Sequence, residues 1–99
     1  MLATIQPQRL RVLVVDDDLD TVDSTAMVLR LVGHDVKTAL NGPEGVARFA
    51  EFQPSVALVD LGMPGMNGYE TARQIQRLIL PKPPVLVALS GYGDARARR

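Results

Sequence analysis

The amino-acid sequence predicts an α/β protein built on a doubly wound parallel sheet with helices on both faces. The first observation is alternation, because short apolar stretches of strand length are separated by longer stretches with apolar residues every three or four positions. The second is the position of glycine and proline, one of which stands where each helical pattern stops. Strands that alternate with helices pair in parallel through right-handed crossovers. With 99 residues, 46% of them hydrophobic, we expect one domain with an ordinary core.

The first strand and the first helix follow a short lead-in. Residues 1–9 show no pattern, and the apolar run at residues 10–15 predicts a strand. Residues 19–32 predict an amphipathic helix, which Gly33 ends because glycine readily adopts the conformation needed just past a last turn. The expected apolar stripe of this helix consists of Val22, Thr25, Ala26, Leu29 and Val32. A short apolar stretch at residues 36–40 predicts the second strand.

The second helix and the third strand occupy the middle of the chain. A helix is expected to start at Asn41, because Pro43 suits the first helical position and Glu44 is favourable in the first turn. It is expected to run to about Phe52, where Pro54 ends it. Its inward candidates are Val46, Ala47, Phe49 and Ala50. Residues 55–59 predict a third strand that is buried on both faces.

A loop rich in turn residues, residues 61–68, leads into the last helix. Residues 69–80 predict that helix, and the prolines that follow it end the helical pattern. Its inward candidates are Ala72, Ile75 and Ile79. Residues 85–89 predict a fourth strand, which leads into Ser90.

Acidic residues follow two of the predicted strands at the point where each strand ends. Asp16, Asp17 and Asp18 come directly after the first strand, and Asp60 follows the third. Ligands of doubly wound sheets bind beyond the carboxyl ends of the strands, so we expect these side chains to converge there, with Ser90 across the site. Three close carboxylates repel one another, and such a cluster is typical of a site that holds a divalent cation. Mg²⁺, which prefers hard oxygen ligands, would allow an aspartate to accept a phosphoryl group.

Three segments together give the chain a specific resemblance. They are VLVVDDD at residues 12–18, LVDLGMPGMNG at residues 58–68 and VALSGYG at residues 87–93. In this order and at this spacing, they resemble the receiver domain of bacterial two-component response regulators and hybrid histidine kinases. The resemblance covers about residues 10–95.

The resemblance implies a role for each matching residue. Asp60 would be the phosphoacceptor, taking a phosphoryl group from a histidine of a partner histidine kinase or histidine phosphotransfer domain. Asp17 would bind Mg²⁺ directly, Asp16 would bind it chiefly through water, and the backbone carbonyl of Gly62 would be a further ligand. Ser90 would be the switch hydroxyl that moves toward the acyl phosphate. A protein of this kind is a signalling phosphoacceptor and not an enzyme.

The resemblance also implies a flavodoxin-like sheet with strand order 2-1-3-4, from which the family's fifth strand and fifth helix are absent. The missing part of the family pattern carries a lysine, followed by proline, that reaches the phosphoryl group. Lys82 is the last lysine of the sequence, and it lies in the loop before the fourth strand, at the opposite end of the sheet. We therefore expect residues 10–99 to be an incomplete receiver domain and the sequence to be part of a longer protein.

The same residues allow several other interpretations. A pseudo-receiver would use this fold as an interaction module without phosphorylation. Residues 18–22 resemble the nucleophile motif of haloacid-dehalogenase-type phosphatases, although the first aspartate of that motif should follow the strand directly. An EF-hand loop starting at Asp16 would need glycine at Thr21 and glutamate at Met27. His34 follows a helix-ending glycine and is interpreted as a structural loop residue.

The composition excludes several other classes of function. The 11 basic and 11 acidic residues balance, so this segment has no electrostatic footprint for nucleic acid or for an anionic membrane. Cysteine is absent, which excludes disulfides and thiolate metal sites. No apolar run approaches the roughly 20 residues of a membrane span, and residues 1–7 lack the pattern of a secretory signal. We expect a cytoplasmic location.

Overall fold

Seven elements alternate along the part of the chain that the computed structural model describes, residues 9–63, 65, 67–78 and 85–89. The strands are β1 (Arg11–Val15), β2 (Asp35–Ala39), β3 (Val56–Asp60) and β4 (Val85–Leu89). The helices are α1 (Leu19–Val32), α2 (Gly42–Phe52) and α3 (Gly68–Gln76). Neighbouring strands pair in parallel in the order β2-β1-β3-β4, which confirms the predicted doubly wound sheet and its strand order.

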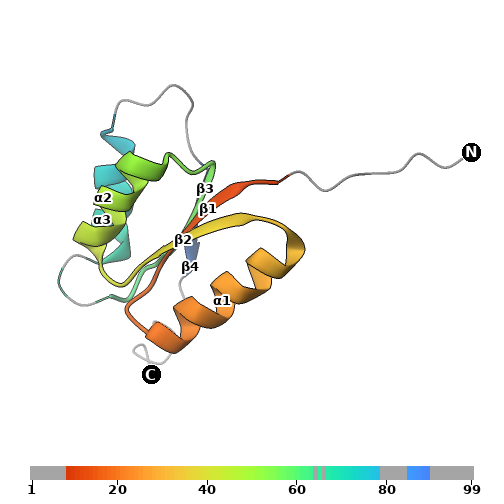
Figure 1. Ribbon diagram of the computed structural model, residues 1–99. Helices are drawn as coiled ribbons and strands as arrows, with labels where there is room; N and C mark the ends of the chain where they lie inside the picture. The colour runs from red at the N-terminus through yellow and green to blue at the C-terminus, as the bar shows by residue number, and fades with distance from the viewer. Residues whose placement is uncertain (1–8, 64, 66, 79–84, 90–99) are drawn as a thin grey trace, which may run out of the picture.

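The sheet separates two helical layers, as Figure 1 shows. α1 packs mainly on β1 and β2 from one side, whereas α2 and α3 lie together on the other side. Because side chains alternate across a strand, each face of the sheet has its own apolar cluster. The cluster beneath α2 and α3 contains Leu13, Val15, Ala39, Phe49, Ala57, Val59, Met63 and Ile75. The cluster beneath α1 contains Val12, Val14, Val22, Ala26 and Val36.

α1 begins and ends as its sequence predicts. Asp18 is the N-cap, and Gly33 ends the helix in the left-handed conformation, with a φ of 110°. Val22 and Ala26 are buried, but Val32 is 58% exposed, so the buried stripe is narrower than predicted. Val32 lies at the margin of the stripe, where contact with the sheet no longer reaches. α1 has 14 residues, and among the helices of the described chain none is long and apolar enough to cross a membrane.

α2 also buries a narrower stripe than its sequence predicts. Phe49 is fully buried, as expected, whereas Ala47 and Ala50 are exposed. The buried residues of the helix are Gly42, Gly45 and Phe49. These positions are three and four residues apart and define one line along the helix, from which Ala47 and Ala50 point away.

β3 differs from its prediction in position and in burial. It includes Asp60, which pairs with Leu89 as the last residue of the strand instead of following it. Val56 and Leu58 are only half-buried, so the prediction of burial on both faces was wrong for these two residues. The reason is that α1 packs mainly on β1 and β2 and leaves the β3 half of its face partly uncovered.

α3 begins at Gly68, one residue earlier than predicted, and ends at Gln76, short of the predicted end. The next two backbone N–H groups bond to carbonyls three residues back, which tightens the last turn and ends the helix. Ile75 is fully buried and Ala72 half-buried, in line with the predicted stripe, and Ile79 lies outside the described residues.

Candidate functional site

The predicted acidic site lies where the two central strands of the sheet end side by side. β1 and β3 are parallel neighbours, with Val15 beside Val59 in the last shared register position. The next residue is an aspartate in both cases: Asp16 directly follows β1, and Asp60 is the last residue of β3. The backbone N–H of Asp16 donates to the carbonyl of Ala39 at 3.1 Å, so β2 holds the other side of this turn.

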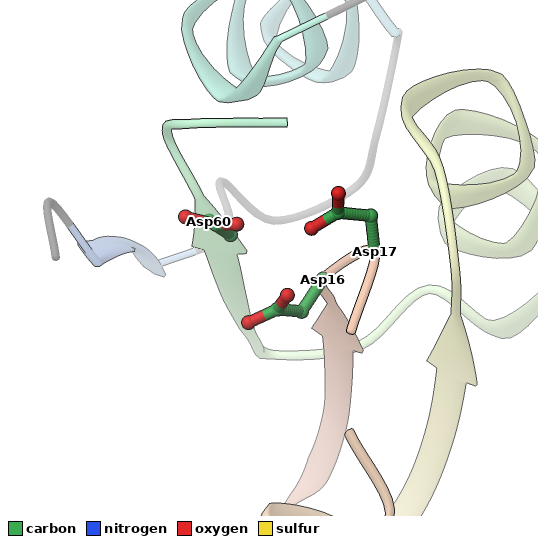
Figure 2. Close-up of side chains that lie close together, drawn as sticks. All are labelled: Asp16, Asp17 and Asp60. Carbon is green, nitrogen blue, oxygen red and sulfur yellow. The ribbon is translucent and has the colours of Figure 1, made fainter. Parts of the chain in front are cut away.

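The structure brings Asp16, Asp17 and Asp60 together. Each of the three carboxylates offers an oxygen that lies within 4.8 Å of the other two. Figure 2 shows the side chains of Asp16 and Asp17 at the end of β1, with Asp60 at the tip of β3 beside them. A separation of this size allows one cation to contact all three carboxylates.

Asp16 is the most enclosed of the three carboxylates, with 9% of its surface exposed, whereas Asp17 is exposed and Asp60 half-buried. Burial raises the pKa of Asp16, and the negative charges of Asp60 and Asp17 raise it further. The backbone N–H of Asp18, which donates to Asp16 Oδ1 at 3.0 Å, lowers this pKa in part. Asp16 thus ionises less readily than a free aspartate.

Gly62 contacts Asp60 through its backbone N–H group. This N–H donates to Asp60 Oδ1 at 3.1 Å and holds the carboxylate at the start of the loop. Gly62 itself is exposed. Its backbone carbonyl as a cation ligand stays a prediction, and the predicted switch residue Ser90 lies outside the described residues.

Two residues that had attracted other interpretations have structural partners. The carboxylate of Asp18 accepts from the N–H of Asp20 at 3.2 Å and from the hydroxyl of Thr21 at 2.8 Å, which is an ordinary helix cap. The Nδ1 atom of His34 accepts from the N–H of Leu10 at 3.1 Å and so joins the end of α1 to the start of β1. Asp18 therefore belongs to the helix, and His34 to the fold.

The residues present fit a hard divalent cation. Three carboxylates supply only oxygen atoms, which Mg²⁺ prefers, and the exposure of Asp17 leaves room for the water ligands that Mg²⁺ usually keeps. In the part of the chain that the structure describes, the ion pair found is Arg73–Glu70, on α3, so no described lysine or arginine neutralises the cluster. Asp16, Asp17 and Asp60 could hold the cation.

The start of α3 is a neighbour of the site that was not predicted from the sequence. Asn67 caps this helix by accepting from the N–H of Glu70 at 3.0 Å, and Gly68 then passes directly against the backbone of Asp60. An asparagine three residues before a glutamate is a helix-start signal that the sequence does contain. The contact between Gly68 and Asp60 has no such signal, because it depends on how the loop folds back.

Comparisons with known proteins agree with this geometry. The family model described as "Response regulator receiver domain" matches residues 12–99. Protein PilH of Pseudomonas aeruginosa is 39% identical over 67 residues, which are 68% of this chain and 55% of that protein. Protein PilG of the same organism is 33% identical over 85 residues, which are 86% of this chain and 63% of that protein.

The solved structures give the same result. The crystal structure of a CheY-like response regulator receiver domain protein from Methanospirillum hungatei is 28% identical to this chain, with a TM-score of 0.72. The similarity covers 91% of this chain and 72% of that one. The chain spans only part of its curated relatives, since the matches to PilH and PilG cover 55% and 63% of their lengths.

Proposed function

This chain belongs to the family of response regulator receiver domains, and on that basis we propose that Asp60 is the phosphoacceptor of a two-component phosphorelay. The proposal is carried by one observation above all, the convergence of Asp16, Asp17 and Asp60 at the joined ends of β1 and β3. The partner would be a histidine kinase or a histidine phosphotransfer domain that presents a phosphohistidine. We further propose that residues 10–99 form the receiver unit.

The position of Asp60 supports its role as the nucleophile. It is the last residue of a strand that has a parallel neighbour on each side, and it is half-buried where the strands end. An oxygen of this carboxylate would form the new bond to phosphorus, while the bond from phosphorus to the imidazole nitrogen breaks and its electron pair returns to the ring. The hydrogen bond from the N–H of Gly62 orients this carboxylate before the reaction.

The other two aspartates supply the electrostatic part of the mechanism. Asp16 and Asp17 would hold Mg²⁺ together with Asp60 and the backbone carbonyl of Gly62. When bound, Mg²⁺ supplies positive charge that offsets the repulsion between the carboxylates and the incoming phosphoryl oxygens. Ser90 would then act as the switch hydroxyl that reports the acyl phosphate to the rest of the fold.

The phosphoacceptor is tested by mass spectrometry of the intact protein after incubation with phosphoramidate and Mg²⁺. We expect one phosphoryl group to be added, and we expect Asp60→Asn to abolish the adduct. Asp23→Asn is the matched control, because Asp23 is an exposed aspartate on α1 outside the acidic cluster. A folded protein that takes no phosphoryl group would favour the pseudo-receiver, and hydrolysis of phosphate esters without an adduct would favour a phosphatase.

A further inference from the structure

Gly68 is the point at which α3 touches the backbone of the phosphoacceptor. It is buried and is the first residue of the helix. A Cβ atom added to it would overlap the carbonyl oxygen of Asp60 and lie 2.7 Å from the carbonyl carbon of Asp60 and 2.5 Å from the Cα of Leu61. Since all of these atoms belong to the backbone, no side-chain rotation could relieve the overlap.

The start of α3 is itself firmly held, so it can act as a fixed support. Thr71 is fully buried, and both its N–H and its hydroxyl donate to the carbonyl of Asn67 at 2.9 Å. One turn further on, Ile75 is fully buried in the same apolar cluster as Val59 and Met63. The first turn of α3 is therefore held by apolar contacts with β3 and by the cap at Asn67.

We infer that Gly68 is a positioning residue, which sets the place of the peptide between Asp60 and Leu61 and thereby aims the Asp60 carboxylate at Asp16 and Asp17. The expected effect on phosphoryl acceptance rests on the proposed function, whereas the contact between Gly68 and Asp60 does not. A side chain at position 68 would push the backbone of Asp60 and Leu61 away from the start of α3. The carboxylate then meets the phosphoryl donor out of line, and misplacement of a reacting group by about 1 Å can reduce a rate by up to about a hundredfold.

The test compares Gly68→Ala with Gly45→Ala in the full chain. Gly45 is a matched control, because it too is a buried glycine in the first turn of a helix. A Cβ atom at Gly45 would lie 3.0 Å from the two methyl carbons of Val15, and the nearest atoms that it would meet belong to this side chain and not to the backbone. The general effect of a crowded glycine is thus present in both variants, while the push on Asp60 is present in one.

Two readouts separate a positioning role from a merely structural one. In ¹H–¹⁵N spectra, Gly68→Ala should shift the amide signals of Asp60, Leu61 and Gly62, including the N–H that bonds to the Asp60 carboxylate, and Gly45→Ala should not. With phosphoramidate, Gly68→Ala should lower the saturated rate of phosphoryl acceptance about tenfold or more relative to Gly45→Ala. The donor concentration for half-saturation should change little, since the alteration affects alignment and not donor contact.

The inference is overturned if the amides of Asp60 to Gly62 respond alike in the two variants, or if both accept the phosphoryl group at the same rate. If Gly68→Ala does not fold, Thr71→Val, which weakens the same support without overlap, must shift those amides, and unchanged signals would overturn the inference. A parent chain that takes no phosphoryl group would contradict the proposed function. The amide comparison would still decide the role of Gly68.

Discussion

Asp16 holds a carboxylate at a position where negative charge is unfavourable. It is nearly buried beside two other carboxylates, and its pKa is raised mainly by that burial and further by the charges of Asp60 and Asp17. A raised pKa in the folded state means that Asp16 favours folding below its ordinary pKa of 3.8 and that this contribution is lost as the pH rises through the raised pKa. At neutral pH the ionised side chain therefore destabilises the fold.

Asp16→Asn should accordingly stabilise the chain in the absence of divalent cations. The amide oxygen can still accept from the N–H of Asp18, so the substitution removes the charge and keeps the hydrogen bond. We expect a higher midpoint of thermal unfolding at neutral pH in the presence of a chelator, and a difference that vanishes below pH 3.8. A variant that is less stable than the parent at neutral pH would show that the cluster is not a source of repulsion.

Binding of the cation should stabilise the folded chain. If Mg²⁺ binds the folded chain and not the unfolded one, a concentration a hundred times its Kd should raise the free energy of unfolding by about 2.7 kcal/mol. Asp17→Asn should remove most of this gain, because Asp17 supplies one of the three carboxylates. Urea unfolding with and without Mg²⁺ measures this gain in the parent and in Asp17→Asn. Asp23→Asn is the control, and it should show the same gain as the parent.

At the scale of elements, the cap of α3 should matter for both stability and reactivity. Asn67→Ala removes the side chain that accepts from Glu70, and Asn41→Ala removes the equivalent contact with Glu44 at the start of α2. Each substitution should lower the free energy of unfolding by about 1 kcal/mol. Of the two variants, Asn67→Ala should also slow phosphoryl acceptance, because α3 begins against Asp60. An equal loss of rate in Asn41→Ala would assign the effect to general destabilisation.

The elements also show how far a sequence of this kind can be interpreted. The alternation of apolar runs and helical patterns gave the order of strands and helices, and the carboxyl ends of parallel strands brought Asp16 and Asp60 together, because both follow from local periodicity and chain direction. Periodicity marks the centre of a buried stripe but not its width, so Val32 and Ala47 were wrongly placed inside. The half-burial of Leu58 depends on which strands α1 covers. The contact of Gly68 with Asp60 depends on the path of a loop. Neither feature is encoded in the local sequence.

At the scale of the whole molecule, the sheet is unevenly covered. β1 lies between two strands and is buried along most of its length, with α1 on one face and α2 on the other. Among the strands that the structure describes, β4 is the outermost one beside β3, and its Val85 and Val87 are 59% and 38% exposed. These two residues are in register with Val56 and Leu58, so they lie on the partly covered face beside α1. The acidic site therefore lies at the end of the best-enclosed strand and its neighbour.

This asymmetry predicts how amide hydrogen exchange is distributed over the fold. Amides of β1 should exchange only through global unfolding, since opening them requires both neighbouring strands and both helical layers to separate. Amides of β4 should exchange about tenfold or more faster through local opening at the edge. Native-state exchange followed by NMR measures this difference residue by residue, and equal rates in the two strands would contradict it. The proposed function fits this distribution, because an aspartate that is to meet a cation and a phosphoryl donor needs a rigid base, and β1 with the adjoining β3 provides one.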